Sequence, residues 1–124
     1  MREFFDFSLP LTGNNLLTTV RLTMGGLAAT AGMNVDDAED FKVCVTESLL
    51  IFKRNGFPSA SAHCVIDDGL EITLLAEHSD DELQNGENEE NEISFALVGA
   101  LVDEVKFQKE KNMVTGVTLY KKSV

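Results

Sequence analysis

Cationic residues are scarce in this sequence: 10 Lys and Arg stand against 21 Asp and Glu, for a formal net charge of −11. Nucleic acids and anionic membranes both attract cations, so this balance argues against either of them as a partner. The excess of acids fits a basic protein partner or a role in solubility alone, and the second interpretation is the commoner one.

Cysteine and long apolar runs are equally scarce. Cys44 and Cys64 are the only cysteines, and they form no CxxC pair. Since there is no signal peptide and no apolar run of roughly 18 residues, we expect a cytoplasmic protein with free, mostly buried thiols. The pair His63–Cys64 and the more distant His78 lack the spacing of a four-ligand site, so no metal is predicted.

The 124 residues suffice for one domain over 1–124, and the hydrophobic content of 44% is ordinary. Residues 36–57 predict a long central helix, capped by Asn34 or Asp36 and ended by Gly56 and Pro58. Its apolar face repeats at spacings of three and four residues: Ala38, Phe41, Val45, Leu49 and Phe52. Its polar side carries Glu39, Lys42, Thr46 and Lys53.

A helix is also predicted before the central one, from a cap at Asn14 or Asn15 to Ala31, with Gly32 ending it. Gly25 and Gly26 inside this helix cost roughly 1 kcal/mol each relative to Ala. That cost predicts the close approach of another helix or of a dimer mate. Arg21 is the only cation of this helix.

Alternating apolar residues predict five strands, with the first at or near a sheet edge. They cover residues 3–9, 60–66, 70–76, 105–108 and 113–120, and the second and third form a β-hairpin. Residues 77–92 hold eight acids and no cation, which predicts a mobile loop. The loop is most simply a solvated linker, and mimicry of a negatively charged surface is the alternative.

The strongly apolar residues 93–105 predict a buried third helix, with Asn91 as a suitable cap. A strand at its start is the alternative, because Ile93 and Phe95 alternate. The resulting order, β-α-α-β-β-loop-α-β-β, predicts an α+β fold: a two-layer α/β sandwich with three helices on one face of a five-stranded mixed or largely antiparallel sheet.

Several segments resemble anti-sigma-factor serine kinases, the single-domain regulators of bacterial stress and sporulation switches. They are residues 20–24 (VRLTM), the small residues up to Gly32, residues 36–43, and Thr46-Glu47-Ser48. The resemblance implies the histidine kinase-like ATPase (GHKL, Bergerat-type) fold, with an ATP pocket closed by a lid. It also implies a homodimer that binds a sigma factor and phosphorylates a serine of an antagonist.

Glu47 matches the family's catalytic carboxylate, the expected general base. One turn later, where the family holds magnesium with Asn, this chain has Ile51, which offers no ligand atom. Where the family binds adenine with Asp-Glu-Gly, this chain has Ala76-Glu77-His78. The family's glycine-rich phosphate turn corresponds to residues 91–95, preceded by Glu89 and Glu90, and the acidic segment 77–92 takes the place of the ATP lid.

These replacements predict a degenerate site with neither ATP nor magnesium as cofactor. Glu47 then becomes a vestigial catalytic residue, retained on its helix and either partly exposed or hydrogen-bonded to a nearby backbone group. Arg21 is either a partner-binding residue or a solvated surface cation. The predicted function is that of an anti-sigma-factor-like regulator that is not an enzyme and that binds a sigma factor or an anti-sigma antagonist as a homodimer. The alternatives are an active ATP-dependent serine kinase and a structural subunit that pairs with an intact homologue.

Overall fold

The computed structural model describes residues 2–13, 16–77, 89–110 and 113–122. Within these ranges the elements follow the predicted order. They are β1 (Glu3–Pro10), α1 (Leu16–Thr30), α2 (Val35–Arg54), β2 (Ser59–Ile66), β3 (Gly69–Ala76), α3 (Glu89–Leu101), β4 (Glu104–Glu110) and β5 (Met113–Lys122). The candidate caps Asn14 and Asn15, and His78, lie outside the described residues.

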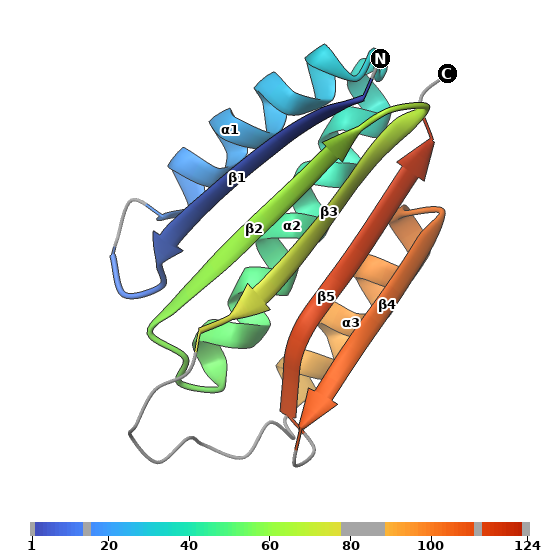
Figure 1. Cartoon of the computed structure of the whole chain (residues 1–124). Coiled ribbons are helices and arrows are strands. Elements are labelled where there is room, and N and C mark those ends of the chain that lie inside the picture. Colours follow the sequence, from blue (N-terminus) through green and yellow to red (C-terminus); the bar gives the residue numbers. More distant parts are fainter. Residues whose placement is uncertain (1, 14–15, 78–88, 111–112, 123–124) are drawn as a thin grey trace.

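The five strands form one sheet in the order β1-β2-β3-β5-β4, with β1 at an edge as predicted (Figure 1). All four neighbouring pairs are antiparallel, so of the two predicted alternatives the antiparallel sheet is confirmed and the mixed sheet is not. The reason is the position of β5. After α3 the chain returns as β4 in the direction of β3, but β5 inserts between the two, so the parallel strands are not neighbours.

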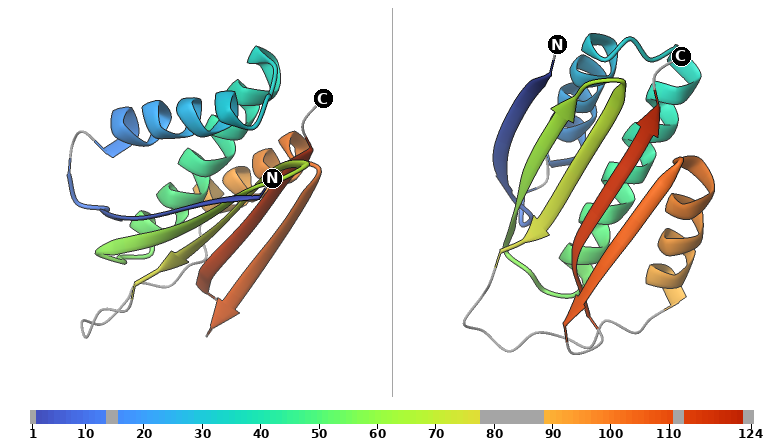
Figure 2. Two further views of the ribbon diagram at one scale, coloured as in Figure 1. Left: turned by 45° about the horizontal axis from the view of Figure 1, so that its top comes forward. Right: turned by 45° about the vertical axis from the view of Figure 1, so that its right-hand side comes forward.

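The helices cover one face of the sheet and leave the other face open, which gives the predicted two layers (Figure 2). The central helix α2 packs against both α1 and α3. Its N-cap is Asn34, whose side chain accepts a hydrogen bond from the Asp37 amide at 2.8 Å. It ends at Arg54, three residues earlier than predicted, and Gly56 follows at a φ of +90°.

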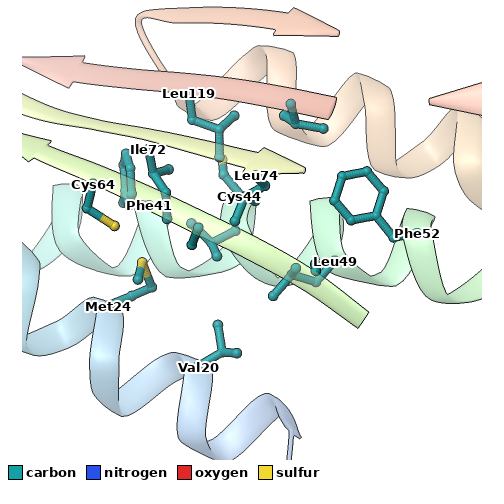
Figure 3. Close-up of a cluster of buried hydrophobic side chains, with 14 of the residues drawn as sticks. Val20, Met24, Phe41, Cys44, Leu49, Phe52, Cys64, Ile72, Leu74 and Leu119 are labelled. Atoms are coloured by element: carbon teal, nitrogen blue, oxygen red, sulfur yellow. The ribbon is translucent and has the colours of Figure 1, made fainter. Parts of the chain in front are cut away.

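Side chains from α1, α2 and the inner face of the sheet form the core (Figure 3). Val20 and Met24 of α1 point toward α2 (Figure 3). Gly25 allows a close approach of α2, because a Cβ atom there would lie 3.2 Å from Lys42 Cε. Gly26 has no such neighbour in the described structure. None of the helices in the described ranges combines the length and apolar character that a membrane span requires.

The third helix differs from its prediction in both position and burial. It starts at Glu89, within the segment predicted to be a loop, and ends at Leu101. Asn91 is therefore a helical residue and not a cap, and it is 1% exposed. Ile93 is 67% exposed and Leu97 37%, so α3 is not a buried apolar helix. The helical alternative for its first residues is confirmed over the strand.

Candidate functional site

Glu47 lies on the side of α2 that faces α3, one turn before the buried segment around Ile51. Its side chain is 25% exposed. Oε2 of Glu47 accepts a hydrogen bond from Ser94 Oγ of α3 at 2.6 Å, and Arg54 Nη2 lies 4.0 Å from the same oxygen. The carboxylate thus has a hydroxyl donor and a cation within the fold, and these contacts offset the cost of its partial burial.

The contact between α2 and α3 continues through Arg54. Its Nη1 donates to Ser94 Oγ at 2.9 Å and to Asn91 Oδ1 at 3.3 Å. Asn91 Nδ2 in turn donates to Asn55 Oδ1 at 3.2 Å. Asn55, Asn91 and Ser94 are each 1% exposed. Their hydrogen bonds offset the cost of burying polar groups, and the five residues form one network between the helices, here called the α2–α3 polar network.

Other residues stand at the positions that correspond to the resembled family's magnesium, adenine and phosphate sites. Ile51 is fully buried in the core. Ala76 ends β3, and the adjacent Glu77 accepts a hydrogen bond from Ser59 Oγ at 2.7 Å. Glu89 and Glu90 are the first two residues of α3. In the described part of the chain, no group of three or more His, Cys, Asp or Glu residues is arranged to hold a metal ion.

Arg21 and Glu47 line the same pocket, which lies between α1 and α2. Its volume is about 320 Å³, and its other walls are Glu39, Lys42, Val43 and Thr46. Lys42 donates to Glu39 at 2.8 Å, whereas Arg21 is exposed and has no ion pair among the described residues. Thr46 was expected on the polar, exposed side of its helix, but it is 5% exposed and its hydroxyl finds no partner in the described structure.

Comparison with known proteins shows which solved structure this fold resembles. No protein-family model matches the chain, and no curated protein matches it. Among solved structures, it is similar to the RsbU and RsbW domains of Rv1364c from Mycobacterium tuberculosis, with a TM-score of 0.69 and 17% identity over 97% of this chain and 32% of that one. The fold resembles that of the RsbW domain. The chain thus spans about a third of the matched protein.

This likeness confirms the predicted α+β, histidine kinase-like ATPase fold. Within this fold, Glu47 and Arg21, the two residues singled out from the sequence, line one pocket. The sequence reasoning missed Arg54, Asn55 and Ser94. Asn91 and Ser94 carried a usable signal, because two polar residues three positions apart on a helix that is otherwise apolar after Glu92 can mark its buried side.

A larger, apolar groove of about 610 Å³ separates β1 from α1. Phe5, Phe7 and Leu9 line it from β1, and Val20 and Leu27 line it from α1. Phe5 lines this groove and is 43% exposed, so the groove leaves a large apolar side chain in contact with water. The alternation of these β1 residues was predicted, but the separation of β1 from α1 was not.

Both cysteines are free and buried, as predicted. Burial raises the pKa of Cys44 from 9.0 to about 12, and burial likewise raises the pKa of Cys64 from 9.0 to about 12. The Sγ of Cys44 lies 3.8 Å from the carbonyl oxygen of Val98 in α3. The thiols are therefore packing groups of the core and poor nucleophiles at neutral pH.

Proposed function

We propose that this chain is an anti-sigma-factor-like regulatory protein that binds a sigma factor or an anti-sigma antagonist and has lost nucleotide binding. The observation that carries the proposal is the state of Glu47. Its carboxylate accepts from Ser94 and lies 4.0 Å from the Arg54 guanidinium, so its charge is compensated within the chain. By resemblance this carboxylate is the catalytic base, and here it is engaged in packing α3 onto α2.

Three further replacements support the loss of nucleotide. A buried isoleucine supplies no oxygen for magnesium at position 51, and Ala76 supplies no acceptor for adenine. The first turn of α3 carries carboxylates where phosphates would have to approach. A lost hydrogen bond to a buried group costs about 1–3 kcal/mol, so two or three such losses reduce affinity by several powers of ten.

Arg21 is the proposed partner-binding residue. An exposed guanidinium without an ion pair among the described residues is free to pair with a carboxylate of a docked protein. The adjacent pocket contains the Thr46 hydroxyl, which has no hydrogen-bond partner among the described residues and could bond to a group of the docked protein. Purified from its native cell extract, the wild-type protein should retain a sigma factor or an antagonist. Arg21→Ala should lose it, whereas Lys53→Ala, which removes an exposed cation elsewhere, should not.

An active serine kinase is the second candidate function, favoured by one observation. Glu47 and Arg21 share a pocket, and the carboxylate remains 25% exposed. Titration calorimetry with ATP and Mg²⁺ separates the two candidates. We expect no measurable binding. A dissociation constant in the low micromolar range, abolished by Glu47→Ala or by chelation of the metal, would favour the kinase and contradict the proposed loss of nucleotide binding.

We also propose that the protein is a homodimer joined through β1 and the β1–α1 groove. Among the described residues no strand pairs with the outer edge of β1, and β1 lacks the lysines and early prolines that commonly protect such edges. Phe4 and Phe5, which belong to β1, are 56% and 43% exposed. A two-fold symmetric contact is the default for such a self-complementary surface.

A further inference from the structure

The helix α3 is not an ordinary amphipathic helix, because it exposes apolar side chains on its outer side while its inner side, where Val98 packs into the core, also carries polar residues. Its polar residues Asn91 and Ser94 face α2 and are 1% exposed, whereas its outer side is apolar. Ile93, Ala96, Leu97 and Ala100 occur at relative positions i, i+3, i+4 and i+7, and all four are exposed. They therefore form one continuous stripe, here called the outer stripe of α3, opposite the face that packs on α2.

The outer stripe is accessible in the described structure. The helix α3 lies at the end of the helical layer remote from α1, with no other helix beyond it (Figure 2). On its sheet side, Phe95 packs against Phe107 of β4, and Lys109 lies over the Phe95 ring. No comparable ring contact covers the outer stripe in the described structure. Its two largest side chains, Ile93 and Leu97, are 67% and 37% exposed.

Acidic residues bracket the outer stripe. Glu92 is exposed at its start, and Asp103 and Glu104 are exposed just beyond its end. A second copy of the chain would place acids against acids in a parallel or an antiparallel contact of two α3 helices. Since like charges repel, and since the chain carries a net charge of −11, this stripe is poorly suited to self-association.

We infer that the outer stripe of α3 docks an amphipathic helix of a different protein, with apolar residues on one face and Lys or Arg beside them. The apolar face would cover Ile93 and Leu97, and the cations would meet the acids at both ends. A helix of 13 residues is about 20 Å long, so the contact alone is small and its affinity modest. The stripe faces away from the α2–α3 polar network, so this inference is independent of the proposed nucleotide loss.

Fluorescence anisotropy with synthetic helical peptides tests the inference. The probe is a labelled peptide of about five turns with Leu on one face and Lys elsewhere. Its comparison peptides carry Glu in place of Lys, or the same residues in scrambled order. We expect the Lys peptide to bind the wild-type chain, with an affinity that falls at high salt. Ile93→Ser and Leu97→Ser should each weaken it about tenfold, because each removes a buried aliphatic contact.

Two variants serve as controls, with folding verified by circular dichroism. Leu75→Ser and Val35→Ser remove large exposed apolar side chains, 43% and 77% exposed, from other surfaces, and neither should change the affinity. The inference is overturned if the Lys peptide does not bind, if the Glu or scrambled peptide binds as well, or if the controls weaken binding equally. It is also overturned if sedimentation shows self-association that Ile93→Ser abolishes, since a second copy would then occupy the stripe.

Discussion

At the scale of single residues, Ser94 joins the two charged groups of the α2–α3 polar network. Its hydroxyl donates to Glu47 and accepts from Arg54, and Ser94→Ala removes both bonds. Breaking one side of a buried hydrogen bond costs about 1–3 kcal/mol. We expect a loss of unfolding free energy in the lower part of that range, because both charged side chains keep some contact with water.

Urea unfolding followed by circular dichroism measures this loss. Ser8→Ala is the matched control, because Ser8 is exposed on β1. An unchanged urea midpoint for Ser94→Ala, or an equal loss in the control, would show that the hydroxyl does not hold α3 to α2. Glu47→Gln keeps an acceptor for Ser94 and should cost less than Ser94→Ala.

The two thiols predict how stability depends on alkaline pH. Burial raises the pKa of Cys44 and of Cys64 from 9.0 to about 12, so above pH 9.0 the unfolded chain loses protons that the folded chain retains. The stability that the thiols contribute is complete below pH 9.0 and is lost as the pH rises toward 12. The double variant Cys44→Ala, Cys64→Ala should therefore lose unfolding free energy less steeply in this range. Equal slopes in urea titrations of both proteins would contradict this expectation.

At the scale of elements, α3 shows what local patterns cannot provide. Its first turn is acidic and polar, so composition indicated a loop up to residue 92. The helix extends to Glu89 because Asn91 and Ser94 bind Arg54, which lies 37 and 40 positions away in the sequence. The elements with strong periodicity, α1, α2 and the hairpin of β2 and β3, were predicted to within three residues at each end.

Replacing either of two glycines by alanine should change the unfolding free energy, in opposite directions for Gly69 and Gly26. A Cβ atom at Gly69 would lie 2.4 Å from the Lys121 carbonyl oxygen, so Gly69→Ala forces β3 away from β5. We expect it to cost about 1–3 kcal/mol of unfolding free energy, as overpacking generally does. Gly26 has open space around it, so Gly26→Ala in α1 should add about 0.5–1 kcal/mol. Thermal or urea unfolding of both variants measures these changes, and a Gly69→Ala protein as stable as the wild type would contradict the strand contact.

At the scale of the whole molecule, the sequence carried enough information for the architecture and for two residues of one pocket. Arg21 and Glu47 were found from local motifs, and the fold brings them together. Their surroundings could not be predicted, because Ser94 and Asn91 reach Glu47 and Arg54 only through the packing of α3 on α2. The groove between β1 and α1 was equally inaccessible to sequence reasoning, since it depends on how far the edge strand stands from the helix.

The proposed homodimer is tested at that groove. Phe5 lines it and is 43% exposed, so a partner subunit would cover it. Since burying an aromatic side chain contributes about 1.5–3 kcal/mol, Phe5→Ser should weaken dimerisation by about tenfold or more. Leu75→Ser removes an equally exposed side chain, also 43%, from β3 and should leave the dimer intact. Sedimentation equilibrium over the micromolar range measures both variants. A wild-type protein that stays monomeric at high micromolar concentration, or equal effects of the two substitutions, would exclude β1 and α1 as the dimer surface.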